Sequence, residues 1–211
     1  MATLMTNGRM MQSLRAGIGF TFRITNMKNY HSFKPAEKSI EYYVYSSTGN
    51  LFEEYVDGIF LQNDTPGQLD ALQNGILPGD FRTDFEANYT LTVNLNNFEK
   101  NMRIIMSLPE QISFGDEDPE CTGLSGTSNA ELICRADRTE KTLTFTNAVQ
   151  FYDANPGQMR ILLKYLKNPV DNIITDSFLI RTETFDGYQM DEISSGITIN
   201  FYCEYPCAQC P

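Results

Sequence analysis

Five cysteines are the residues with the most obvious chemistry in this chain of 211 residues. Cys121 and Cys134 flank a segment rich in Gly, Ser and Thr, which is typical of a loop between two short strands. A disulfide between them would therefore staple that hairpin. Cys203, Cys207 and Cys210 crowd the C-terminal end with the spacing C-x-x-x-C-x-x-C. Because the total is odd, at least one thiol lacks an internal partner, or the chain is a piece of a longer protein.

The three C-terminal cysteines allow three interpretations. Zinc would need a fourth ligand and a reducing compartment, and no histidine lies nearby in the sequence. Catalytic redox use of Cys207 and Cys210 would need a thioredoxin-like βαβ pattern, which is missing. The favoured interpretation is that residues 203–211 begin a disulfide-bonded, cysteine-rich module, with these cysteines paired within the tail or with residues outside this chain.

Two N-x-T sequons, Asn63-Asp-Thr65 and Asn88-Tyr-Thr90, are candidate sites for N-linked glycans. Such triplets arise often by chance, so either one alone is a weak signal. Together with the paired cysteines, they favour an oxidising, secreted setting over a reducing one. We therefore expect the protein to be extracellular or at the cell surface, with glycans at Asn63 and Asn88.

Acidic side chains gather at two places where they could bind calcium. Residues 115–120 form an acidic loop that contains Asp116 and Asp118, and a second turn is followed by Asp191 and Glu192. Calcium takes six to eight oxygen ligands, which carboxylates supply. Neither place has the regular ligand spacing of an EF-hand, so a solvated charged loop is the alternative. We expect no other cofactor.

A catalytic site is not predicted. His31 is the only histidine, and it lies in a polar connection between Tyr30 and Ser32 without triad-like surroundings. The residues or spacings of a histidine zinc cluster and of a P-loop are missing. The sequence therefore favours a structural or binding protein over an enzyme.

The composition favours β-sheets and limits the partners. Phe and Tyr are abundant, with 14 and 11 residues, and there is no Trp. The formal net charge of −11 would repel nucleic-acid backbones and anionic membranes. No segment approaches the roughly 20 apolar residues of a transmembrane helix. We expect neither nucleic acid as a partner nor direct insertion into a membrane.

Short alternating segments with turn signals every 8–12 residues or so predict an all-β fold, an antiparallel β-sandwich of the Ig-like class, over residues 85–202. Residues 63–84 are rich in Asn, Asp, Pro and Gly, which is typical of a linker. Earlier strands are expected over 19–25, 40–45 and 56–61. The strands expected in the sandwich are 89–95, 102–108, 111–114, 131–135, 142–146, 159–166, 177–182 and 197–202.

Residues 1–62 resemble the C-terminal half of this sandwich. A constant offset of 138 relates Gly49 to Gly187, Glu54 to Glu192, Gly58 to Gly196 and Ile59 to Ile197. Lys28-Asn29 matches Lys167-Asn168 at an offset of 139, one residue away. We therefore expect a tandem repeat in which residues 1–62 are a partial copy and residues 85–202 a complete one.

A half-sandwich has unpaired edges and an exposed apolar face, so something must complete it. One hypothesis is a neighbouring subunit that adds a strand and builds a filament or coat by self-association. The other is that upstream residues supply the missing half. An alternative function is a module that binds glycans or cell-surface partners through exposed Tyr30, Phe33 and Tyr188.

Several loose motifs in the last third of the chain give a family likeness. They are Lys167-Asn-Pro169, T-x-S-F-x-I from Thr175, D-G-Y-x-x-D-x-x-x-S-G from Asp186, and the cysteine spacing from Cys203. This part resembles the very large surface proteins of ciliates, in which such β-domains precede or alternate with furin-like or EGF-like cysteine-rich repeats. The likeness covers residues 121–211 best and residues 20–62 by repetition. It implies that Cys207 and Cys210 open a neighbouring cysteine-rich module, in a surface coat, an adhesion protein or an extracellular filament.

Overall fold

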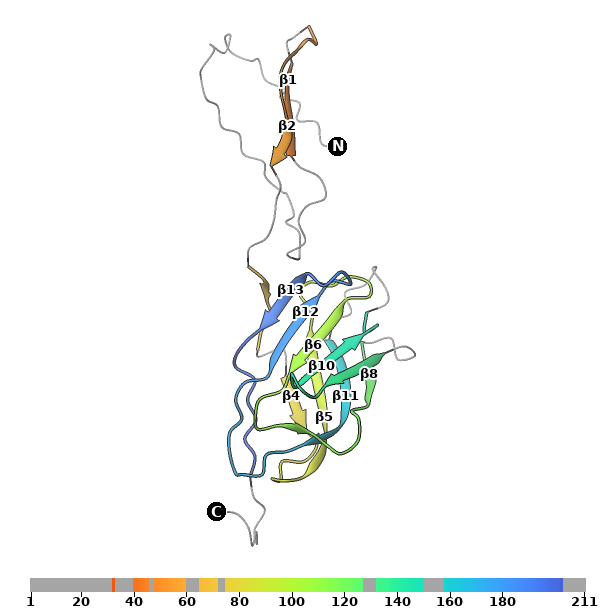
Figure 1. Ribbon diagram of the computed structural model, residues 1–211, viewed down its shortest axis with the longest axis vertical. Coiled ribbons are helices and arrows are strands. Elements are labelled where there is room, and N and C mark those ends of the chain that lie inside the picture. The colour runs from red at the N-terminus through yellow and green to blue at the C-terminus, as the bar shows by residue number, and fades with distance from the viewer. Residues whose placement is uncertain are drawn as a thin grey trace.

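The computed structural model describes residues 32, 40–45, 48–59, 65–71, 75–126, 132–149 and 158–202. Within these ranges the chain forms thirteen strands and no helix (Figure 1). The described residues accordingly provide no helix that could cross a membrane. The strands are β1 Ile40–Tyr45, β2 Leu51–Ile59, β3 Gly67–Gln68, β4 Gly75–Pro78, β5 Glu86–Asn94, β6 Arg103–Ser107, β7 Ser113–Phe114, β8 Cys121–Ser125, β9 Ile133–Asp137, β10 Thr142–Thr146, β11 Gln158–Lys167, β12 Leu179–Glu183 and β13 Gln189–Ile193.

Strands β3 to β13 form two packed sheets. The first has six strands in the order β3-β13-β12-β6-β10-β9. The second has β4, β5 and β11 in that order, and β7 and β8 both pair with β11 on its other side. All pairs of described strands are antiparallel except β3 with β13, which is parallel. The predicted all-β, Ig-like antiparallel sandwich is confirmed.

The core lies between the two sheets and follows the alternation that predicted the strands. Side chains of β5 alternate strictly between the core and the outer face. Strand β11 alternates as far as Leu163, where a bulge with Tyr165 at φ 64° shifts the register so that Leu166 still points inward. Each fully buried large side chain contributes about 1.5–3 kcal/mol. The largest core residues are Tyr89, Phe145, Phe178, Phe201, Leu91, Met102, Ile104, Met106, Ile112, Leu143, Met159 and Ile161.

The sandwich begins earlier in the chain than the sequence predicted. The expected linker over 63–84 contains β3, which pairs with β13, and β4, which pairs with β5. Pro78 and the neighbouring glycines suggested a linker, but β4 is an edge strand, where proline is tolerated because one side needs no backbone partner. The N-terminal strands of the sandwich therefore lie at one edge of each sheet.

The end of the sandwich also differs from the prediction. The strand expected over 197–202 forms no ladder, although Ile197, Ile199 and Phe201 are buried. This segment makes two isolated bridges, Asn200 with Ile174 and Tyr202 with Arg82. The last strand with a ladder is instead β13, in the acidic stretch between the strands expected over 177–182 and 197–202.

Strands β1 and β2 form a separate two-stranded antiparallel sheet (Figure 1). The strand expected over 40–45 is present as β1. The strand expected over 56–61 begins earlier, because β2 spans 51–59. The strand expected over 19–25 lies outside the described residues.

Candidate functional site

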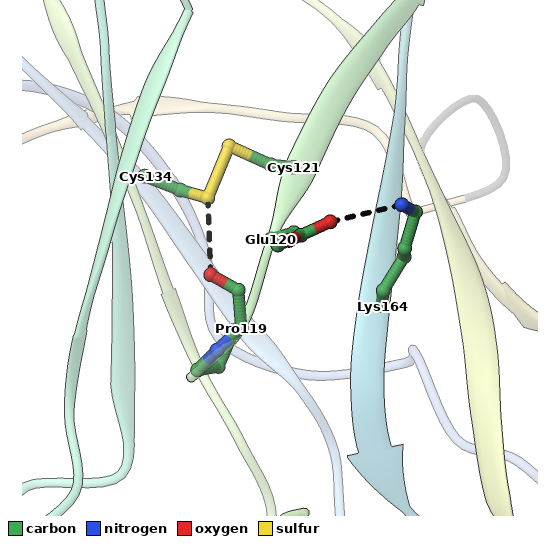
Figure 2. Close-up of a disulfide and its surroundings, with 5 residues drawn as sticks. All are labelled: Pro119, Glu120, Cys121, Cys134 and Lys164. Carbon is green, nitrogen blue, oxygen red and sulfur yellow. Dashed lines mark hydrogen bonds and ion pairs between the residues drawn. A yellow bond between two sulfur atoms is a disulfide. The ribbon is translucent and has the colours of Figure 1, made fainter. Parts of the chain in front are cut away.

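The predicted disulfide between Cys121 and Cys134 is present, but it does not staple a hairpin. Cys121 begins β8, which pairs with β11 in the five-stranded sheet. Cys134 lies in β9, which pairs with β10 in the six-stranded sheet. The bond spans 6.0 Å between the Cα atoms and joins the edges of the two sheets (Figure 2). It therefore holds the sandwich closed along one side.

The segment before the disulfide is bound to β11. Nζ of Lys164 forms an ion pair of 2.9 Å with Oε2 of Glu120, the residue before Cys121 (Figure 2). The hydrogen bond and negative charge of Glu120 raise the pKa of the Lys164 amine. The negative charges of Glu120 and Glu117 raise the pKa of the adjacent Tyr165 hydroxyl. On the other side, Sγ of Cys134 lies 3.7 Å from the carbonyl oxygen of Pro119.

Arg138 binds the acidic loop over residues 115–120. Its guanidinium donates hydrogen bonds of 3.0 Å to the carbonyl oxygens of Gly115 and Glu117. The same group lies 3.3 Å from Oδ1 of Asp118. Arg138, which follows β9, thus supplies a counter-charge to the loop, and Asp118 is paired with it. Asp116 is exposed in the same loop.

The second acidic pair has a structural role. Asp191 is fully buried, and its carboxylate accepts hydrogen bonds from the backbone N of Asn97 at 3.0 Å and from its Nδ2 at 2.6 Å. Glu192 accepts a 2.7 Å hydrogen bond from Nε2 of Gln189. At Gly67, an added Cβ would lie 1.9 Å from Oδ1 of Asp191, so only glycine lets β3 run beside β13 here. Asp191 therefore attaches the β5–β6 loop to β13 in the six-stranded sheet.

The weak calcium candidates do not form one site. In the described part of the chain, no three His, Cys, Asp or Glu side chains come together as a metal would require. Asp116 and Asp118 lie in the loop between β7 and β8, whereas Asp191 and Glu192 lie in β13. The carboxylate of Asp191 is already bound to Asn97, which the sequence did not indicate.

Asn88 occupies a position that a glycan could use. It lies in β5 with its side chain exposed on the outer face of the five-stranded sheet. Tyr89 points into the core, and Thr90 returns to the same face as Asn88. Several other predicted residues lie outside the described residues: Asn63, Tyr30, His31, Phe33, Cys203, Cys207 and Cys210.

The outer face of the six-stranded sheet has a shallow groove that the sequence did not predict. Its volume is about 90 Å³, and it lies over β6, β12 and the end of β13. Arg181 stands opposite Ile105 on one side and Glu192 on the other. The exposed Leu179 adds an apolar surface beside these charges. Such a mixed, open surface suits contact with another macromolecule better than enclosure of a small substrate.

Two arginines on this face share one carboxylate. Nη2 of Arg103 lies 2.9 Å from Oε2 of Glu183, and Nε of Arg181 lies 3.1 Å from Oε1 of the same residue. These three residues come from β6 and β12, which are more than seventy positions apart in the chain. Only the folded pairing of the two strands brings them together.

Comparisons with known proteins give weak likenesses. No protein-family model matches this chain, and no curated protein matches it. Among solved structures, the collagen-binding domain from a Staphylococcus aureus adhesin is 11% identical, with a TM-score of 0.36 over 61% of this chain and 94% of that chain. The RrgA Jo.In complex is 13% identical, with a TM-score of 0.36 over 69% and 92%. The collagen adhesin (CNA) from S. aureus is 10% identical, with a TM-score of 0.38 over 71% and 54%.

Proposed function

We propose that this chain is part of an extracellular structural and interaction protein built from tandem copies of one β-sandwich. The observation that carries the proposal is a shared pairing register between two hairpins. Each residue pair of β12–β13 becomes a pair of β1–β2 when 138 is subtracted from both numbers. The pairs are Ile180–Ile193 with Tyr42–Tyr55, Arg181–Glu192 with Tyr43–Glu54, and Glu183–Gln189 with Tyr45–Leu51.

Further details of the two hairpins agree at the same offset. The register shifts between Val44 and Tyr45 in one hairpin, and between Arg181 and Glu183 in the other. Both turns contain a glycine in the left-handed region, Gly49 at φ 86° and Gly187 at φ 90°. A constant offset through strands, bulge and turn supports duplication of a whole domain.

The proposed extracellular setting draws on two features of the sandwich. The Cys121–Cys134 disulfide would persist in an oxidising compartment and be reduced in a cytosol. The side chain of Asn88 is exposed, so its sequon is accessible for glycosylation. A cell-surface coat or filament, such as those that the ciliate likeness implies, meets both conditions.

The proposed mode of assembly is strand addition at β1. In the sandwich, β12 lies between β13 and β6. Among the described residues, β1 pairs only with β2, so its other edge corresponds to the edge of β12 that binds β6. An antiparallel strand from a neighbouring subunit would pair with β1 by backbone hydrogen bonds. Head-to-tail contacts of this kind produce open filaments when the rotation between subunits does not close a ring.

The test compares two substitutions at one position of β1 in the full chain. The side chain of Tyr43 is exposed, so Tyr43→Ser keeps the backbone donor while Tyr43→Pro removes it. We expect the wild type and Tyr43→Ser to assemble in sedimentation and electron microscopy, and Tyr43→Pro to remain monomeric. Monomers in all three samples would contradict strand addition.

The extracellular setting is tested separately on native material. Non-reduced peptide mapping, with and without deglycosylation, should reveal sugar at Asn88 and a Cys121–Cys134 cross-link. A bare Asn88 together with free thiols would contradict a secreted location.

A second candidate function is adhesion to a glycan or cell-surface partner. The observation in its favour is the β12–β13 turn, where Phe185 and Tyr188 are both exposed. Exposed aromatic rings provide rigid, amphipathic contact surface. A glycan array with the wild type and Tyr188→Ala would distinguish this function, because only the adhesion hypothesis predicts specific binding that the substitution abolishes.

A further inference from the structure

Exposed apolar side chains gather at the end of the sandwich where the chain continues beyond Tyr202. Backbone hydrogen bonds link Tyr202 to Phe81, Phe201 to Ile173 and Asp84 to Pro169, so three separate segments meet there. Five large apolar residues on these segments are exposed, although nearby core residues such as Phe201 are fully buried. This exit patch consists of Phe85, Val170, Ile173, Ile174 and Tyr202.

The backbone beneath the exit patch is held by hydrogen bonds and an ion pair. Asn168 is buried, and its Nδ2 donates to the carbonyl oxygens of Asp80 at 3.0 Å and Arg82 at 2.7 Å. Arg82 in turn forms an ion pair of 2.6 Å with Asp80 and lies 4.3 Å above the ring of Phe85. An apolar surface that is already ordered loses little conformational entropy when another segment packs on it.

Aromatic stacking extends this support to the last described residue. The rings of Phe81 and Tyr202 are stacked, with centroids 6.3 Å apart and planes 12° from parallel. Phe81 also lies against the buried Phe201, at 6.4 Å between centroids. The exposed ring of Tyr202 is thus anchored to the core through Phe81, immediately before the chain reaches Cys203.

The corresponding end of the first copy is not apolar, and this step depends on the proposed tandem repeat. There the chain continues into a second sandwich, whereas after Tyr202 it continues into the segment with three cysteines. The apolar patch thus occurs in the copy that is followed by the three cysteines, and not in the copy that is followed by a second sandwich. At offsets of 138 or 139, Val170 corresponds to His31 or Ser32, Ile173 to Lys34 or Pro35, Ile174 to Pro35 or Ala36, and, at 138, Tyr202 to Asp64.

We propose that residues 203–211 pack back against the sandwich and bind the exit patch. Cys203 follows Tyr202 directly, and nine residues reach at most about 30 Å, so the segment begins on the patch and stays within its reach. Its apolar residues Tyr205 and Pro206 would be covered by Val170 and Ile174, giving a rigid junction to a cysteine-rich module.

Hydrogen exchange of the oxidised full chain tests this proposal with two matched double variants. Val170→Ser/Ile174→Ser alters patch residues that are 70% and 61% exposed. Phe185→Ser/Leu77→Ser alters residues outside the patch that are 69% and 62% exposed. In the wild type and the control variant, we expect amides of 203–211 to exchange at least about tenfold more slowly than in the free peptide. In the patch variant, we expect them to exchange at the free-peptide rate.

Two results would overturn the proposal: exchange of residues 203–211 at the free-peptide rate in the wild type, or equal acceleration by both variants. Exchange within β6 and β11 reports whether each variant is folded. If the patch variant does not fold, nuclear Overhauser contacts between the Ile174 methyls and the Tyr205 ring in the wild type decide the question. The two proposals can fail separately. If residues 203–211 are protected from exchange and Tyr43→Pro still assembles, the first result supports docking on the exit patch and the second contradicts strand addition.

Discussion

The hairpins β1–β2 and β12–β13 have the same pairing register but different surroundings. In the sandwich, β12 is bordered by β6 and β13 by β3, so both strands of the hairpin have a partner on each side. In the described residues, β1 and β2 pair only with each other. An isolated two-stranded sheet is only marginally stable in water, whereas a hairpin inside a larger sheet is stabilised by its neighbouring strands. Local sequence therefore specifies the hairpin, and neighbouring strands determine how stable it is.

The largest expected effect comes from proline at equivalent positions of the two hairpins. Arg181 lies in the middle of β12, between β6 and β13, so Arg181→Pro removes a ladder hydrogen bond inside the sheet. We expect it to lower the free energy of unfolding of the sandwich by about 3 kcal/mol or more. The matched change Tyr43→Pro should leave that free energy unchanged. Urea unfolding followed by circular dichroism measures both, and equal losses would contradict a separation of the two regions.

Removal of the inter-sheet disulfide should have the next largest effect. Cys121 and Cys134 are 13 positions apart, and closing a loop of this size stabilises a protein by about 3 kcal/mol. We expect Cys121→Ala/Cys134→Ala to lose that amount in urea unfolding, with no change in the hydrogen exchange of β1 and β2. The wild type under reducing conditions is the control and should match the variant. Faster exchange in β1–β2 after loss of the disulfide would mean that the hairpin depends on the sandwich.

The sequence predicted the strands whose side chains alternate and missed strands that are short or irregular. Strands β5, β10 and β11 have clear period-two patterns and were found. Strand β3 has two residues, and the four residues of β4, Gly-Ile-Leu-Pro, do not alternate between apolar and polar types, so neither is recognisable from the sequence. Strand β13 has adjacent buried residues, Met190 and Asp191, where alternation predicts one inside and one outside. Strand β3 is ordered by pairing with β13, far away in the chain, whereas β4 and β13 pair with the neighbouring strands β5 and β12.

The chemistry of single residues was predictable only where it depended on local spacing. The spacing of Cys121 and Cys134 suggested their bond, but whether it joins one sheet or two depends on where β8 and β9 lie. Asp191 looked like a surface ligand, because nothing nearby in the sequence identifies Asn97 as its partner 94 positions away. The groove and the exit patch each combine segments that only the folded sheets bring together.

A third comparison uses pH, because burial raises the pKa of Tyr89 well above its usual range. Below the pKa of an unfolded tyrosine, about 10, both states are neutral and stability is unaffected. Above it, the unfolded state loses a proton that the folded state keeps, so stability falls by about 1.4 kcal/mol per pH unit. We expect Tyr89→Phe to remove this slope from urea unfolding of the sandwich at alkaline pH. An unchanged slope in the variant would contradict the raised pKa.

Tyr89→Phe should also have a smaller effect at neutral pH. The hydroxyl of Tyr89 donates a hydrogen bond to Oδ1 of Asn168, and both groups are buried. Loss of one such bond lowers the free energy of unfolding by about 1 kcal/mol. The alkaline slope and the neutral loss are therefore separable in one pair of titrations. Tyr89→Phe should not alter the hydrogen exchange of β1–β2, which lies outside the sandwich.

A last comparison separates the hairpins at their turn glycines. Gly187 and Gly49 have φ of 90° and 86°, and a residue with a Cβ is disfavoured there by about 1–2 kcal/mol. At Gly187 an added Cβ would lie 2.9 Å from Nη2 of Arg103, a flexible group, whereas at Gly49 it would meet nothing within 4 Å. Gly187→Ala should therefore lower the free energy of unfolding of the sandwich by about that strain. Gly49→Ala should only accelerate hydrogen exchange in β1–β2. If Gly49→Ala destabilised the sandwich as much, the two hairpins would belong to one cooperative unit, because strain in an independent hairpin has no route into the sandwich.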